Sequence, residues 1–88
     1  MVYVFIGNGA TFPAGIFNSY VEGEMWISNT KVSGILTEMP VGTGIYDWAI
    51  ENEFFKITKE YQKGSKFIQK FSSASLNHWY FENGCLLD

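Results

Sequence analysis

The chain of 88 residues is 47% hydrophobic and 18% aromatic, and it carries a formal net charge of −3. This much apolar side chain excludes an intrinsically disordered protein, and a chain of this length is expected to form a single domain over residues 1–88. Every cation is a lysine, so the chain lacks the bidentate arginine fork that reads phosphates and base edges.

The first predicted elements are two strands joined by a turn. Residues 2–6 alternate β-branched and aromatic side chains, which is typical of a strand. Asn8-Gly9 predicts a type I′ hairpin turn, because both residues tolerate a positive φ. Residues 10–17 predict a second strand, which Pro13 restricts to an edge or a bulge. We interpret "GNG" as a turn, since a dinucleotide-binding loop needs a third glycine three positions later.

A helix and a third strand are predicted next. Ser19 and Glu22 have the spacing of a capping box, and the helical pattern continues to near Asn29. Residues 31–41 predict the third strand, which Pro40 ends.

The following segment predicts shorter helices. Asp47 is the expected N-cap of a helix over residues 48–55. Gly64 breaks the lysine-rich stretch, and Ser65 is expected to cap a further turn over residues 66–71.

Residues 76–83 predict a final strand that is rich in aromatic side chains. Alternation along it places Trp79 and Phe81 on one face and Tyr80 on the other. The element order β-β-α-β-α-(α)-β predicts an α+β fold, a small antiparallel sheet with helices packed on one face.

An ordered set of motifs across residues 2–84 resembles a family of small uncharacterised bacterial domains of unknown function. The motifs are "VFIGNGATFPAGIFNS", "SGILTEMP", "YDWAIENEFF", "FIQKFSSAS" and "HWYFENG". The family pattern often has a second histidine where Tyr80 stands here, which argues against a two-histidine metal site. The resemblance implies the fold and carries no activity.

Candidate catalytic groups are few. Asp47 and Glu51 stand four residues apart, so they are either paired carboxylates for acid–base chemistry or a helix cap with a solvated glutamate. His78 is the single histidine, and we interpret it as a packing or hydrogen-bonding residue. Cys85 is the single cysteine, which excludes an internal disulfide, and its apolar neighbours indicate an inert thiol. We therefore expect no enzyme, no metal and no cofactor.

Aromatic residues are the stronger indication of function, because Tyr and Trp without a catalytic set favour a protein-binding surface. Whether those of the last strand are core or surface is left open by the pattern. The predicted binding residues are Tyr46, Trp48, Glu51, His78, Trp79, Tyr80 and Phe81. The leading hypothesis is a non-enzymatic protein-interaction domain, of the immunity or inhibitor type, with an unidentified protein partner. The alternative is a small enzyme or ligand-binding domain that uses Asp47, Glu51 or His78.

Lysines concentrate in residues 56–70, which carry five lysines and one glutamate. Their spacing of three and four would align them on one helix face, but the break at Gly64 interrupts it. We expect no nucleic-acid partner from lysines alone in an acidic chain. No apolar run approaches the roughly 18 residues of a transmembrane helix, and the N-terminus lacks signal-peptide features. The expected location is the cytoplasm, with no membrane partner, and homo-oligomerisation is left open.

Overall fold

The computed structural model describes residues 1–87, and the chain divides into two compact units. The first, which we call the sheet unit, combines Met1–Met39 with Leu76–Asp88; the second, the aromatic unit, is Pro40–Ser75. Each unit is described by itself. The expectation of one domain over residues 1–88 stays a prediction.

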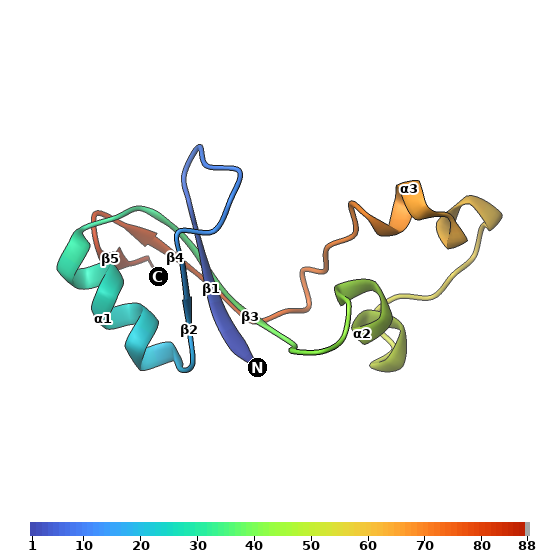
Figure 1. The fold of residues 1–88 in the computed structure, drawn as a ribbon, viewed down its shortest axis with the longest axis horizontal. Helices are drawn as coiled ribbons and strands as arrows, with labels where there is room; N and C mark the ends of the chain where they lie inside the picture. Colours follow the sequence, from blue (N-terminus) through green and yellow to red (C-terminus); the bar gives the residue numbers. More distant parts are fainter. Residues whose placement is uncertain (88) are drawn as a thin grey trace. The chain divides into compact units, whose positions relative to one another are not determined.

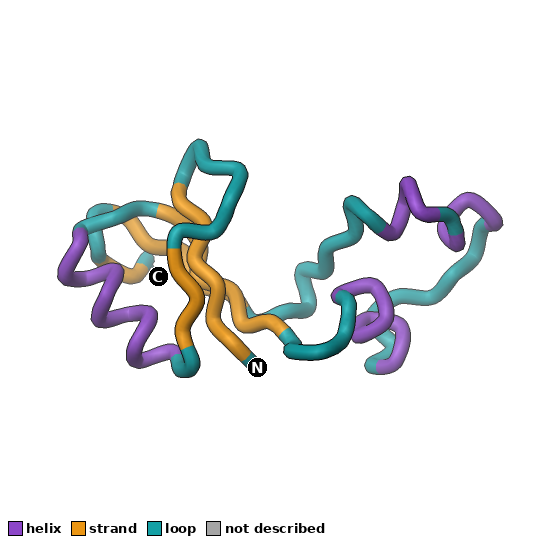
Figure 2. The backbone as a smooth tube through the Cα atoms, in the orientation of Figure 1, coloured by secondary structure: helices purple, strands orange, loops and turns teal. Residues whose placement is uncertain are grey.

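Five antiparallel strands form the sheet unit, in the order β2-β1-β3-β4-β5 (Figures 1 and 2). The strands are β1 (Val2–Gly7), β2 (Gly15–Phe17), β3 (Gly34–Met39), β4 (His78–Glu82) and β5 (Cys85–Leu86). The predicted α+β class with an antiparallel sheet is confirmed. The predicted order lacked β5, and the third and last strands are shorter than expected.

Helix α1 (Tyr20–Thr30) packs on one face of this sheet. Phe5, Ile27, Leu36 and Phe81 form the buried core between helix and strands. Gly23 belongs to this contact, because a Cβ there would lie 3.1 Å from a methyl of Leu36. The glycine that weakens the helix in isolation therefore lets it approach the sheet.

The start of α1 confirms the predicted capping box. The Ser19 hydroxyl accepts a hydrogen bond from the Glu22 amide at 3.2 Å, and the Asn18 amide donates to the Glu22 carboxylate at 2.9 Å. The helix ends one residue later than expected, at Thr30, with Lys31 in the left-handed region at φ 61°.

The turn predicted at Asn8-Gly9 is confirmed, but its predicted type I′ conformation is wrong. The Ala10 amide donates to the Gly7 carbonyl at 3.0 Å, which closes a turn in which only Gly9 has a positive φ, of 76°. A type I′ turn requires a positive φ at both central residues. Strand β2 pairs with β1 only from Gly15 onward, because the segment before it contains Pro13, which has no N–H to donate to a ladder.

A two-residue hairpin of the expected kind lies elsewhere, at Asn83-Gly84. Both residues have a positive φ, 51° and 82°, and Glu82 pairs with Cys85 on either side of them. This is the φ pattern of a type I′ turn. It joins β4 to β5, where the sequence predicted the end of the last strand.

The aromatic unit contains α2 (Ile45–Glu51), the 3-10 helix η1 (Glu60–Lys63) and α3 (Ser65–Ile68). Its interior is a set of mutually contacting rings, and the Tyr46 hydroxyl donates to the Gln62 carbonyl at 2.8 Å. The ring set consists of Tyr46, Phe55, Phe67 and Phe71.

Three expectations about these helices need correction. Gly44, not Asp47, is the N-cap of α2, and Asp47 lies within its first turn. Gly64, not Ser65, precedes the first residue of α3. The sheet unit contains α1 but neither α2 nor α3, because the segment between β3 and β4 packs its own aromatic rings together. Packing of helices on one sheet face is therefore confirmed for α1 alone.

Candidate functional site

Three aromatic rings lie together on the face of the sheet that α1 covers. Tyr3 comes from β1, Tyr20 from the first turn of α1 and Trp79 from β4. The ring centroids of Tyr20 and Trp79 are 4.8 Å apart, and Tyr3 lies 6.5 Å from Tyr20 and 6.1 Å from Trp79. All three side chains are half-buried, so the rings pack against the core and still reach the surface.

A carboxylate, Glu38, lies at one end of these rings. It accepts a hydrogen bond from the Tyr3 hydroxyl at 2.8 Å and another from the Asn77 side-chain amide at 2.9 Å. The hydrogen bond from Asn77, and then that from Tyr3, lower the pKa of Glu38 below its ordinary value. The hydrogen bond to Glu38 in turn raises the pKa of Tyr3.

A second carboxylate, Glu24, lies one helical turn after Tyr20. The Tyr20 hydroxyl donates to it at 3.0 Å. Burial, and then this hydrogen bond, raise the pKa of Tyr20 above its ordinary value. We call the five residues the acidic aromatic strip: Tyr3, Tyr20, Glu24, Glu38 and Trp79.

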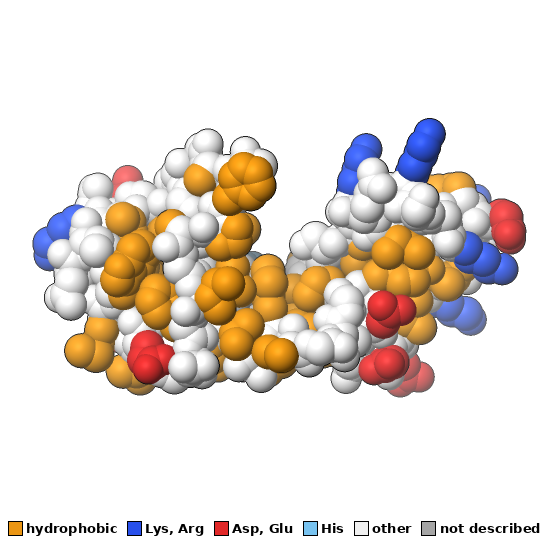
Figure 3. Space-filling view, viewed as in Figure 1, with side chains coloured by type: hydrophobic (Ala, Val, Ile, Leu, Met, Phe, Trp, Pro, Cys, Tyr) orange, Lys and Arg blue, Asp and Glu red, His pale blue; other side chains and the backbone are white. Residues whose placement is uncertain are grey.

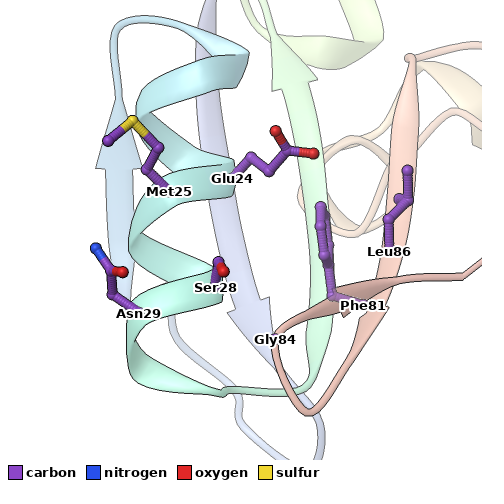
Figure 4. A pocket seen from close by; sticks show the side chains of 7 residues that line it. All are labelled: Glu24, Met25, Ser28, Asn29, Phe81, Gly84 and Leu86. Atoms are coloured by element: carbon purple, nitrogen blue, oxygen red, sulfur yellow. The ribbon is translucent and has the colours of Figure 1, made fainter.

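Beyond Glu24 the strip opens into a groove between α1 and the β4–β5 hairpin, with a volume of about 270 Å³. Figure 4 shows Glu24 projecting from α1 toward Phe81 and Leu86. Phe81 is buried, whereas Met25 and Leu86 are 59% and 43% exposed. The lining residues are Glu24, Met25, Ser28, Asn29, Phe81, Gly84 and Leu86.

Gly84 lines this groove and holds the β4–β5 hairpin close to α1. Its amide donates to the Val32 carbonyl at 2.9 Å, and the Asn83 amide donates to the Ser33 hydroxyl at 2.9 Å. A Cβ on Gly84 would lie 3.0 Å from the Ile27 carbonyl oxygen, so the hairpin turn lies directly against the last turns of α1. The type I′ turn therefore positions β5 as one wall of the groove.

The arrangement suits recognition of a cationic, partly apolar group. Carboxylates attract a cation, and aromatic faces add a favourable electrostatic contact. Within residues 1–87, no three His, Cys, Asp or Glu side chains are placed to hold a metal ion. None of the helices in the described residues has the length and hydropathy of a membrane span.

Comparison with known proteins gives one result. A family model described as "Domain of unknown function (DUF7710)" matches residues 2–87. The chain belongs to this family. Its predicted resemblance to a family of unknown function is confirmed, and the match spans both units. The chain matches no curated protein and no solved structure.

The last strand of this DUF7710 domain separates its four predicted binding residues between two faces. Trp79 and Phe81 both face α1: Trp79 belongs to the strip and Phe81 lines the groove. Tyr80 is 51% exposed on the opposite face, where its ring lies 5.5 Å from that of His78. The expected alternation is confirmed, and it resolves the open question of core or surface: Phe81 is core, Trp79 is half-buried and Tyr80 is surface. Nδ1 of His78 lies 2.7 Å from the Leu76 carbonyl oxygen.

The other predicted site residues lie in the aromatic unit. Tyr46 is a buried member of its ring set, and the Trp48 ring packs on Phe54 at 5.3 Å. Glu51 and Asp47 are exposed on α2. Neither carboxylate contacts the other predicted residues through a hydrogen bond among residues 1–87.

The lysines of residues 56–70 are all exposed, and Figure 3 shows lysine side chains extending from the aromatic unit into solvent. Gly64 separates η1 from α3 in an extended conformation, so the predicted interruption of the lysine stripe is confirmed. Lys63 forms an exposed ion pair with Glu60 at 3.4 Å. Cys85 is an exposed free thiol, and its predicted inertness stays a prediction.

Sequence reasoning missed four residues of the strip. Strand alternation places Tyr3 on the same face as Phe5, and the spacing of Tyr20 and Glu24 aligns them on the helix. These signals were present in the sequence. The contact of Tyr3 with Glu38 joins residues 35 positions apart, and no local pattern indicates it.

Proposed function

We propose that this DUF7710 member is a small, cytoplasmic, non-enzymatic protein-interaction domain that binds a partner protein through the groove and the acidic aromatic strip. The observation that carries the proposal is the groove itself. It combines a buried aromatic floor, exposed apolar side chains at Met25 and Leu86, and a charged rim at Glu24.

This combination matches the composition of protein interfaces. Binding energy there comes from aromatic and apolar anchors in a desolvated centre, surrounded by polar groups. Tyr20 and Trp79 extend the apolar floor along α1, because their rings are in contact and half-buried. A partner that covers both the groove and the strip would bury apolar and aromatic surface together.

A more specific form of the proposal is an immunity or inhibitor role in a bacterial cell. An acidic domain of this size is suited to cover a basic surface on a partner and block it, because complementary potentials raise the rate of encounter. The groove supplies the apolar contact that such a complex needs for a long lifetime.

The test compares capture of partners by the wild type and by charge-introducing variants. Met25→Asp and Leu86→Asp place a carboxylate on the wall of the groove. Phe12→Asp is the matched control, since Phe12 is a 77% exposed apolar side chain in the loop before β2. We expect the same cellular protein to be retained by the wild type and by Phe12→Asp, and to be lost with both groove variants. Retention by all four proteins, or by none, contradicts the proposal. Capture of a second copy of this chain would instead identify self-association.

The alternative, a small enzyme or ligand-binding domain that uses Asp47, Glu51 or His78, is not favoured by the contacts of these residues. The two carboxylates are exposed on α2, and the His78 ring packs against Tyr80. General acid–base chemistry depends on a group that is held and tuned by its surroundings.

A further inference from the structure

We infer that the groove receives a lysine or arginine side chain of the partner protein, whose cationic end pairs with Glu24. This inference rests on the proposed function and names the group that the partner inserts.

Glu24 is held in place before any partner binds. Its Oε2 accepts the hydrogen bond from the Tyr20 hydroxyl, and among the residues that the structure describes, Oε1 has no hydrogen-bond partner. The side chain projects toward Phe81 and Leu86 (Figure 4). One oxygen therefore fixes the carboxylate, and the other is available to a donor that enters the groove.

The charges around the groove favour a cation. Among the described lining residues, Glu24 alone is charged. The sheet unit carries four glutamates and one lysine over residues 1–39 and 76–87. No ion pair within residues 1–87 involves Glu24, since the pair that forms joins Lys63 to Glu60. A purely apolar occupant would leave the Glu24 carboxylate desolvated without a counter-charge, which is costly.

The size and lining of the groove favour a long side chain over a cofactor. A volume of about 270 Å³ lies below the roughly 300–1,000 Å³ of typical small-molecule pockets. Lysine and arginine combine an apolar stem with a charged end. The stem would contact Phe81 and Leu86, and the charged end would reach Glu24.

The experiment is a titration of the full chain, followed by amide NMR, with two probes of similar shape. Nα-acetyl-lysine methylamide, which keeps its side-chain ammonium, is the cationic probe. Nα-acetyl-norleucine methylamide is its apolar counterpart. We expect the lysine probe to cause saturable shifts at the Glu24, Ser28 and Gly84 amides up to about 50 mM. The norleucine probe should bind about tenfold more weakly, because it lacks the charge-assisted hydrogen bond.

Glu24→Gln should reduce lysine-probe affinity about tenfold and leave norleucine-probe affinity unchanged. Glu82→Gln is the matched control: it removes the same charge from an exposed residue of β4 that does not line the groove, and it should bind both probes like the wild type. The spectrum of each variant establishes that it is folded.

Equal affinity for the two probes, no saturable shift with the lysine probe, or an equal loss in Glu82→Gln would overturn the inference. The proposed function would survive these results if Met25→Asp and Leu86→Asp still abolished capture of the partner. Loss of partner capture in Glu24→Gln but not in Glu82→Gln would extend the inference to the natural complex.

Discussion

The chain contains the dipeptide Asn-Gly twice, and the two copies adopt different turns. Asn83-Gly84 joins β4 to β5 with a positive φ at both residues, whereas in Asn8-Gly9 only the glycine has one. Asn83-Gly84 is flanked by a paired strand on each side. Asn8-Gly9 opens a loop, and the chain pairs with β1 again only at Gly15.

The surroundings of the two glycines differ more than their backbones do. Their φ values are 82° for Gly84 and 76° for Gly9. A Cβ on Gly84 would lie 3.0 to 3.2 Å from backbone atoms of α1 and Lys31, whereas a Cβ on Gly9 would have nothing within 4 Å. The dipeptide sets the available φ angles, and its long-range contacts decide whether it builds a hairpin. In this fold the turn packed against α1 also shapes the groove.

The largest effect is expected at Gly84. Gly84→Ala forces a side chain into the left-handed region and against the backbone of α1, and it should lower the free energy of unfolding by about 2–3 kcal/mol. Chemical denaturation measures this change as a shift in the midpoint denaturant concentration, provided that the m-value stays the same. A cost of less than about 1 kcal/mol would show that the hairpin turn does not press on α1.

Gly9→Ala should cost about 1 kcal/mol, because only the positive φ opposes the methyl group. The same denaturation experiment measures this cost. Gly42→Ala is a matched control that should cost about as much as Gly9→Ala, since Gly42 has φ 82° and open space around its Cβ position. A cost at Gly9 equal to that at Gly84 would remove the contrast between the two turns.

Replacing the asparagine should also cost more stability in the second turn than in the first, but the difference should be smaller than that between the two glycines. Asn83 has φ 51°, so Asn83→Ala should cost about 1 kcal/mol, whereas Asn8 has no positive φ and Asn8→Ala should cost a few tenths. Denaturation midpoints of the two variants, measured together, give the difference. Equal costs would mean that both turns have the same conformation in solution.

The smallest effect is a pH dependence at the far end of the strip. Because hydrogen bonds lower the pKa of Glu38 in the folded state, its ionised form contributes stability above the ordinary value of 4.5. That contribution is lost as the pH falls through the lowered pKa. Glu38→Gln should therefore be less stable than the wild type at neutral pH and approach it in acid. A difference between the two proteins that is constant with pH would contradict the hydrogen-bonded carboxylate.

Local patterns predicted much of the fold. The capping box of Ser19 and Glu22, the alternation of Trp79, Tyr80 and Phe81, and the break at Gly64 all depend on neighbouring residues, and each was read correctly from the sequence. The turn at Asn8-Gly9 was predicted at the right position but with the wrong conformation, since Asn8 lacks the positive φ of a type I′ turn and β2 pairs with β1 only from Gly15.

The candidate site was predictable only in part. Trp79 and Phe81 were expected as binding residues, but Glu38 reaches Tyr3 and Asn77 from positions 35 and 39 residues away. The groove forms because Gly84 lets the β4–β5 hairpin lie against α1. Such contacts follow from the tertiary arrangement, which no dipeptide or spacing encodes.

Site-specific photo-crosslinking tests the central claim, binding of a partner in the groove between α1 and the β4–β5 hairpin, most directly. A photoreactive phenylalanine analogue would replace Met25 in one protein and Phe12 in another, since both native side chains are exposed. We expect the analogue at position 25 to cross-link to a partner peptide that contains a lysine or an arginine. We expect the analogue at position 12 to give no cross-linked partner. Equal cross-linking at both positions, or cross-linking at position 12 alone, would contradict it.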